Sequence, residues 1–188
     1  MDIEMKVKVA ALTMLVASYS FASEGPYVGV DLTFANETEL KVNSVSITED
    51  NDIGFNLLAG YDMPLSNEAS LGLELEYRTY DGADFEGVLK TSGNAFFVNA
   101  APKYFINDNF YIGATLGFGQ LELEVEVTDG INKAKDSETG TAFQYGIQAG
   151  YVINSALSGT LGYRSMSADV DGVDTTISGL YAGLRYSF

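Results

Sequence analysis

The sequence predicts an all-β protein, an eight-stranded antiparallel up-and-down transmembrane β-barrel. Three observations lead to this fold class: eight segments alternate apolar with polar or small residues, the connections alternate between short and long, and aromatic residues gather near the segment ends. A period of two is typical of strands, and an even number of strands with short turns at one end and long loops at the other is typical of membrane barrels.

Eight segments keep the period of two between Pro26 and the last residue. The apolar row of the first segment consists of Val28, Val30, Leu32 and Phe34. The predicted strands cover, in order, residues 27–35, 52–62, 69–80, 93–105, 110–127, 141–153, 156–167 and 179–188. Pro102 lies inside the fourth strand, and because proline has no N–H donor for the ladder, we expect a local bulge or a strand end there.

The connections between the segments are sorted by length. Three are short: 64–68, 107–109 and 154–155. Four are long and polar: 36–51, 81–93, 120–141 and 168–176. Apolar residues alternate with glutamates from Leu121 to Val127, so we expect the fifth and sixth strands to extend past the membrane as a hairpin. A soluble meander gives no reason for this sorting, whereas a membrane barrel does.

Aromatic residues of the apolar rows stand mostly at the strand ends, with aliphatic residues between them. At the short-turn end they are Tyr61, Tyr104, Phe110, Tyr151, Tyr186 and Phe188. Toward the long loops they are Phe34, Phe55, Tyr77, Phe96, Phe118, Phe143 and Tyr163. Two aromatic girdles around an aliphatic band are how a barrel meets two lipid–water interfaces. The alternative is a β-sandwich or a soluble barrel whose core has aromatic rims.

The second row of the strands is charged, amidic or small, which predicts that it faces the barrel interior while the apolar row faces lipid. Glycines fit a crowded interior, and charges of both signs neutralise each other there. The predicted interior charge network consists of Asp31, Glu74, Glu76, Arg78, Lys103, Arg164 and Arg185. Within it, Asp31 is predicted to pair with Arg185 across the seam that closes the barrel. A lipocalin-like barrel, with the apolar row inside around an apolar ligand, is the alternative.

The composition limits the possible functions. A formal net charge of −16 disfavours nucleic acid and other polyanions as partners. There is no Cys and no His, and no spacing of Ser, Asp, Glu or Lys suggests a catalytic site, so we expect no enzymatic activity and no cofactor. The stretch Asp169-Val-Asp-Gly-Val-Asp174 is similar to a calcium loop but lacks the later bidentate Glu, so no metal site is predicted.

The first residues are predicted to be a signal peptide. Lys6 and Lys8 precede an apolar run, and Ser20-Phe21-Ala22 supplies small residues at a cleavage site. The apolar run is shorter than the ~20 residues that a helix needs to span a bilayer. We therefore expect export, with residues 1–22 as the signal peptide and 23–188 as the barrel domain. Asp2 and Glu4 interrupt the basic start, which favours Met5 over Met1 as initiator.

The carboxyl-terminal segment GLYAGLRYSF carries the most specific resemblance to known proteins. Its alternate places hold Leu180, Ala182, Leu184, Tyr186 and Phe188. Together with the signal peptide and the eight strands, this row makes the chain similar to small outer-membrane barrels, the group of the OmpA transmembrane domain, OmpX and the opacity proteins. The resemblance implies that the barrel-assembly machinery reads the terminal row, and that the protein resides in the bacterial outer membrane. Outer-membrane enzymes of similar build share a His base, which this chain lacks.

The predicted function is a non-enzymatic structural and surface-exposed outer-membrane barrel with a filled polar interior. Its expected partners are outer-membrane lipid and lipopolysaccharide, the assembly machinery during insertion, and an unidentified surface ligand at the acidic loops. These loops are expected to support envelope integrity or surface interaction. Two alternatives stay open: a soluble secreted lipocalin-like binder of an apolar ligand, and a narrow ion channel.

Overall fold

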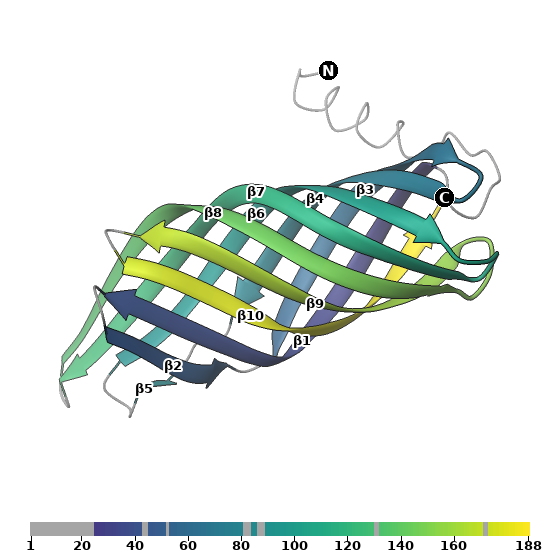
Figure 1. Cartoon of the computed structure of the whole chain (residues 1–188). Helices are drawn as coiled ribbons and strands as arrows, with labels where there is room; N and C mark the ends of the chain where they lie inside the picture. Colours follow the sequence, from purple (N-terminus) through teal and green to yellow (C-terminus); the bar gives the residue numbers. More distant parts are fainter. Residues whose placement is uncertain are drawn as a thin grey trace, which may run out of the picture.

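The described part of the chain consists of β-strands joined by turns (Figure 1). The computed structural model describes residues 25–42, 45–51, 53–80, 84–85, 89–129, 132–170 and 173–188. Its strands are β1 (Gly25–Val42), β2 (Val45–Asn51), β3 (Gly54–Ser66), β4 (Ala69–Tyr80), β5 (Asp84–Phe85), β6 (Leu89–Phe105), β7 (Phe110–Asp129), β8 (Asn132–Val152), β9 (Leu157–Val170) and β10 (Val173–Ser187). Among these residues there is no helix long and apolar enough to cross a membrane. The predicted signal peptide, residues 1–22, lies outside the described residues.

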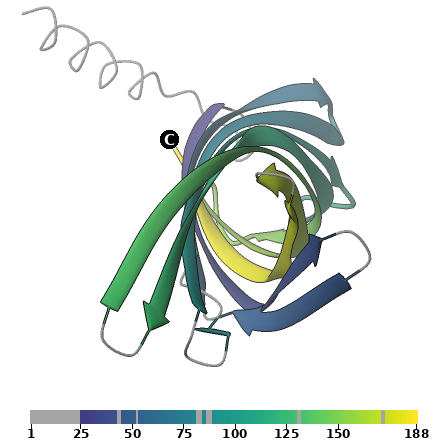
Figure 2. The ribbon, with the colours of Figure 1, turned by 90° about the vertical axis from the view of Figure 1, so that its left-hand side faces the viewer.

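Eight of the strands form a closed antiparallel barrel, as the sequence predicts. Each of β1, β3, β4, β6, β7, β8, β9 and β10 pairs with the next, and β10 pairs back with β1. At this seam Leu32 lies opposite Ala182, and the backbone N–H of Phe188 donates to the carbonyl of Pro26 at 3.1 Å. Closure leaves no unpaired edge along the wall, which a bilayer requires (Figure 2).

The apolar row of the strands faces outward, as predicted. Leu32, Leu57 and Phe118 are 52%, 50% and 62% exposed, and all thirteen aromatic residues of the two predicted girdles have exposed side chains. Neighbouring girdle residues stack edge to face, with ring centroids 4.8 Å apart for Phe110–Tyr151 and 5.8 Å for Phe118–Phe143. The lipocalin-like alternative required the apolar row inside, so the structure contradicts it.

The strands extend further than the sequence predicts at the long-loop end. The predicted loop 36–51 is largely a hairpin of β1 with β2, in which Val42 lies opposite Val45. The predicted loop 168–176 is mostly strand as well, and β5 lies inside the predicted loop 81–93. Segment 45–48, Val-Ser-Ile-Thr, alternates apolar with polar residues over a short stretch and contains three β-branched residues, which favour strands. The hairpin expected beyond the fifth and sixth strands is confirmed, since β7 and β8 pair out to Asp129 and Asn132.

Pro102 produces neither of the two predicted irregularities. Strand β6 continues through it, and the register with β7 is the same before and after it. Instead, the β6–β7 ladder has pairs at Ala100 and at Lys103 but none at Ala101 and Pro102. The missing N–H of proline thus interrupts pairing with one neighbour, while pairing with β4 continues, with Leu71 opposite Pro102.

A bulge lies instead in β1, between Phe34 and Glu37. Ala35 has φ = 50° there, and the bulge inserts one extra residue opposite β10. Before the bulge the odd-numbered side chains Asp31 and Thr33 are buried, whereas after it the even-numbered Asn36 and Thr38 are buried. Beyond the bulge, the even-numbered residues of β1 therefore face the interior and the odd-numbered residues face outward.

Candidate functional site

The barrel interior holds eight buried charged side chains among the described residues, four acidic and four basic. They are Asp31, Asp62, Glu74, Glu76, Arg78, Lys103, Arg164 and Arg185. Seven of them are the residues that the sequence analysis places in the interior. Because their formal charges cancel, the net charge of −16 arises elsewhere in the chain.

Asp31 lies at the seam and binds two arginines. Arg185 donates from Nη1 to Asp31 Oδ1 and from Nη2 to Oδ2, the latter at 3.2 Å, so that the pair spans the β1–β10 closure. Arg164 on β9 donates to Asp31 Oδ2 at 3.4 Å. Gly183 faces this pair from β10, and a Cβ there would crowd Asp31 Oδ1 and Arg185 Nη1, so any other residue would require these side-chain ends to move.

Glu76 on β4 is the centre of the network. Its Oε1 accepts hydrogen bonds from Arg164 Nη1 at 2.6 Å and from Arg78 Nη2 at 2.6 Å. Its Oε2 accepts from Asn99 Nδ2 at 2.7 Å and from Gln144 Nε2 at 2.8 Å. A fully buried carboxylate with four donors from β4, β6, β8 and β9 cross-links strands on several sides of the barrel.

Glu74 and Lys103 lie nearer the short-turn end, where both contact Tyr27. Glu74 Oε1 accepts a hydrogen bond from Tyr27 Oη at 2.7 Å. Lys103 Nζ lies 2.6 Å from Asp62 Oδ2 and 4.7 Å from the centre of the Tyr27 ring. The predicted residues thus form a central group around Glu76 and Asp31 and a second group around Lys103, and Asn99 links them because its Nδ2 donates to Glu76 at 2.7 Å and to Glu74 at 3.5 Å. Asp62, which the prediction missed, continues the inward row of its strand by one place.

An apolar cluster fills the interior toward the long-loop end. Its members are Ala95, Phe97, Leu121, Ala142, Met166, Ala168 and Ile177, with Tyr80 and Leu123 packed against them. Phe97, Leu121 and Met166 are 0% exposed. Arg78 joins the two layers, because its guanidinium carbon lies 5.7 Å from the Phe97 ring and 5.8 Å from the Tyr80 ring.

On β7 and β9 the wall around the apolar cluster is inverted relative to the wall below, whereas on β6 Phe97 lies between the exposed apolar residues Phe96 and Val98. Leu121 is buried while its neighbours Gln120 and Glu122 are exposed, and Ala168 is buried between exposed Ser167 and Asp169. Apolar residues inside and polar residues outside are typical of a soluble barrel. The sequence analysis missed this cluster, although Phe97 and Met166 are large apolar residues within polar rows and were the available signal.

Residues 9–188 match the family model described as outer membrane protein beta-barrel domain. The chain belongs to this family. It is therefore a protein of the bacterial outer membrane, as the sequence predicts. A search of curated proteins finds no match to the chain.

Several solved structures have the same fold as this outer-membrane barrel. Neisserial surface protein A (NspA) is 16% identical with a TM-score of 0.62, and the match covers 91% of this chain and 100% of that one. Ail, the attachment invasion locus protein of Yersinia pestis, is 18% identical with a TM-score of 0.51, covering 87% and 99%. The outer membrane protease OmpT of Escherichia coli is 11% identical with a TM-score of 0.51, covering 92% and 99%. At these identities the likeness establishes the fold and no activity.

The terminal row of this outer-membrane barrel faces outward on β10. Its members Leu180, Leu184, Tyr186 and Phe188 are 43%, 49%, 49% and 44% exposed, and Ala182 is exposed as well. The rings of Tyr186 and Phe188 meet edge to face, with centroids 5.3 Å apart. The row therefore lies beside the seam, on the strand that pairs with β1 to close the barrel.

The stretch 169–174 forms part of the β9–β10 hairpin. Asp169 and Asp174 are exposed and lie directly opposite each other on β9 and β10, whereas Asp171 lies outside the described residues. Over the described part of the chain, no group of three or more acidic residues is arranged to hold a metal ion.

Proposed function

We propose that the protein is a non-enzymatic structural barrel with a sealed interior, which displays acidic hairpins at the cell surface for envelope integrity or surface interaction. Membership of the outer-membrane barrel family supports the location. The absence of His and Cys from the sequence supports the lack of enzymatic activity, because a histidine base or a thiol nucleophile is unavailable.

The Glu76-centred network is the observation that carries the sealed interior. An interior of about eight strands is just wide enough for side chains to fill it. Side chains from β1, β4, β6, β8, β9 and β10 meet in this network, and the buried apolar cluster toward the long-loop end adds a second filled layer in support of the seal. An ion crossing the barrel would have to separate buried ion pairs and then pass Phe97, Leu121 and Met166.

Conductance in planar bilayers tests the seal. The purified barrel, with its folded state verified by a mobility shift on heating in a detergent gel, is expected to give no steady single-channel current. The narrow-channel alternative predicts a steady current that changes when Arg78 or Glu74 is neutralised. A steady current in the unmodified protein, altered in Arg78→Gln and unchanged in an exterior control such as Glu122→Gln, would establish a channel instead.

The acidic hairpins are the proposed contact surface. The buried charges cancel, so the excess of acidic residues lies outside the interior and repels polyanions such as lipopolysaccharide phosphate unless divalent cations bridge the two. Binding of the reconstituted barrel to lipopolysaccharide is expected to depend on calcium or magnesium. A variant in which a short Gly-Ser turn replaces residues 124–137 is expected to bind less, and a barrel that binds equally well without divalent cations contradicts this part of the proposal.

A further inference from the structure

The short-turn end of the interior contains buried polar atoms that the charge network does not use. Asp62, Ser70 and Lys103 are 7%, 3% and 9% exposed. Lys103 Nζ donates to Asp62 Oδ2 at 2.6 Å, but Asp62 Oδ1 and Ser70 Oγ have no hydrogen-bond partner within the described part of the chain. Burying a polar atom without a partner is costly, and such atoms normally bind a protein group or an ordered water. The two atoms therefore indicate a ligand at this end.

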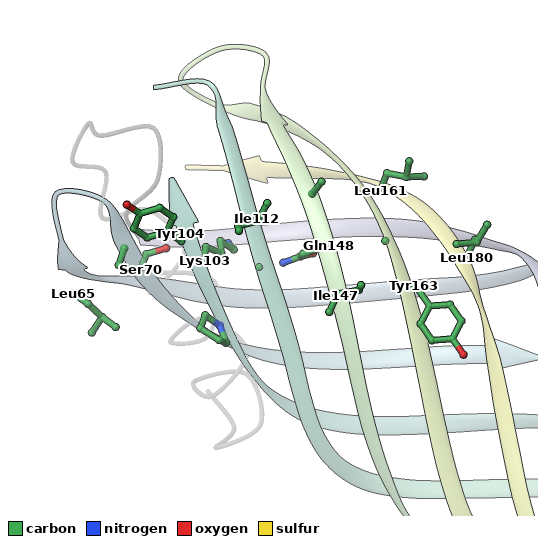
Figure 3. Close-up of a pocket in the computed structure, with 15 residues that line it drawn as sticks. Leu65, Ser70, Lys103, Tyr104, Ile112, Ile147, Gln148, Leu161, Tyr163 and Leu180 are labelled. Atoms are coloured by element: carbon green, nitrogen blue, oxygen red, sulfur yellow. The ribbon is translucent and has the colours of Figure 1, made fainter. Parts of the chain in front are cut away.

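The strand register brings the three side chains together. Ser70 on β4 lies opposite Lys103 on β6, and Gly72, the next residue of the same inward row, lies opposite Asp62 on β3. Directly opposite residues of antiparallel strands have Cβ atoms ~4.5–5.5 Å apart. Ser70 and Lys103 lie side by side near the short β3–β4 turn (Figure 3). Polar groups from three neighbouring strands thus meet at one level of the interior.

Gly72 keeps the free oxygen of Asp62 open. A Cβ at Gly72 would lie 2.9 Å from Asp62 Oδ1 and 2.8 Å from Tyr27 Oη. The carboxylate therefore lies against bare backbone, and a larger residue at this position would crowd its free oxygen. Tyr27 already donates its hydroxyl proton to Glu74, so it does not satisfy Asp62 Oδ1.

The free groups suit a small neutral ligand that both donates and accepts hydrogen bonds. Asp62 Oδ1 accepts, Ser70 Oγ donates or accepts, and Lys103 has three N–H donors, of which Asp62 Oδ2 takes one. A water at this place would have about three partners, which is the usual number for a buried water. The ammonium of Lys103 repels a cation here, and the carboxylate of Asp62 repels an anion.

We propose that the short-turn end of the interior binds one ordered water, which bridges Asp62 Oδ1, Ser70 Oγ and Lys103 Nζ. The bridge joins β3, β4 and β6 near this end, as Glu76 joins strands at the centre of the barrel. The site stabilises the folded interior, and it is independent of the proposed surface role of the hairpins and of the absence of conductance.

A crystal structure of the detergent-solubilised barrel, at a resolution that shows waters, tests the site directly. Density is expected within about 2.7–3.2 Å of both Ser70 Oγ and Asp62 Oδ1. In Ser70→Ala this density is expected to be lost or displaced. A direct hydrogen bond from Ser70 Oγ to a protein acceptor, or no density beside ordered Ser70 and Asp62 side chains, overturns the proposal.

The sign of one stability change provides a second test. Ser70→Ala is expected to raise the equilibrium constant of unfolding in urea about fivefold, because roughly one net hydrogen bond is lost. A hydroxyl without a ligand predicts the opposite, since removing an unpartnered buried polar group leaves stability unchanged or raises it. Ser167→Ala, at an exposed position of β9, is the control and should change the constant by about twofold or less.

Each variant is first verified to be folded by its heat-dependent gel mobility. An unfolding constant that is unchanged or lower in Ser70→Ala overturns the proposal. The measurement is repeated with choline in place of sodium as the only added cation, and the effect of Ser70→Ala is expected to stay the same. An effect that disappears in choline would identify a bound cation instead of a water and would also overturn the proposal.

Discussion

The middle of the barrel interior and its long-loop end are equally shielded from solvent, but different forces hold them together. Around Glu76, charged and amide side chains satisfy one another by hydrogen bonds. Around Phe97, apolar side chains pack together, and Tyr80 Oη donates a hydrogen bond to Met166 Sδ at 3.0 Å. On β7 and β9 the difference follows the surroundings of the wall, because at Leu121 and Ala168 the outer face is polar, whereas at Glu76, and also at Phe97 on β6, it is apolar. Burial alone therefore does not determine the chemistry of this interior.

The outer wall meets two solvents, lipid and water, and their difference explains the contrast. Within the bilayer the outward side chains must be apolar, and burying apolar side chains inside gains nothing over leaving them in lipid. Where the wall emerges into water, the hydrophobic effect acts as it does in a soluble protein and favours an apolar interior. The inversion between Phe118 and Gln120 on β7, both exposed, marks the level at which the wall leaves the membrane.

Removing the centre of the polar layer should have the largest effect. Glu76→Ala leaves Arg78 and Arg164 without their shared carboxylate, and an unpaired buried charge costs about 3–5 kcal/mol. Unfolding in urea, followed by the loss of the heat-dependent gel shift, measures the loss. The exposed Glu122→Ala on β7 is the matched control and should change stability by less than about 0.5 kcal/mol. Equal effects of the two substitutions would mean that the network does not stabilise the barrel.

The stability of the apolar layer should fall when a cavity is made in it, and not because a charge is lost. Phe97→Ala is expected to destabilise the barrel by about 3–4 kcal/mol, because a fully buried ring is removed from a closed cluster. Phe118→Ala, at the 62% exposed position on the outer wall, should cost clearly less. High salt should leave most of the Phe97→Ala loss unchanged, since the charge beside this ring is the buried Arg78 guanidinium, 5.7 Å from its centre, which salt screens little. A loss that depends strongly on salt would contradict the distinction between the two layers.

The seam pair allows the strength of the polar layer to be measured directly. A double-mutant cycle of Asp31→Asn and Arg185→Gln is expected to give a coupling energy of about 2 kcal/mol, because contacting residues of one buried network are not additive. Asp31→Asn combined with Glu122→Gln on the exterior should be additive within about 0.5 kcal/mol. Additivity in the first cycle would mean that the Asp31–Arg185 pair does not stabilise the closed barrel and that backbone pairing alone holds the seam.

The smallest effect is expected at the short-turn end. Tyr27→Phe removes only the hydroxyl that donates to Glu74. Loss of a hydrogen bond to a charged group costs about 1.5–3 kcal/mol, and we expect a loss of stability near the lower value because Tyr27 lies at the edge of the network. Tyr61→Phe, whose ring is 54% exposed, is the control. Equilibrium unfolding compares the stabilities of the two variants. An unchanged unfolding midpoint for Tyr27→Phe would mean that the Tyr27–Glu74 hydrogen bond does not stabilise the barrel.

Particular residues show how far sequence reasoning reached. The rows of Leu32, Leu57 and Phe118 were predictable because lipid on the outside imposes a strict period of two. The phase of Asn36 and Thr38 was not, because it depends on the bulge at Ala35, whose extra residue is defined only by pairing with β10. The outer parts of β1 and β10 were left as loops, because residues such as Asn36, Glu37 and Thr175 are mostly polar while hydrogen-bonded strand pairing continues through them.

By itself, the sequence determined the number of barrel strands and the residue types of their two rows, since both follow from local alternation. That the apolar row meets lipid was predicted from the charges and glycines of the other row, and the structure decided it against the lipocalin-like alternative. The tertiary structure alone decided which interior residues meet. Arg164 could have paired with any acidic residue of the interior, and only the register across β8, β9 and β10 places it between Asp31 and Glu76. In the same way, Ala69 and Leu161 lie in one cross-strand row only because the register of four successive strand pairs aligns them.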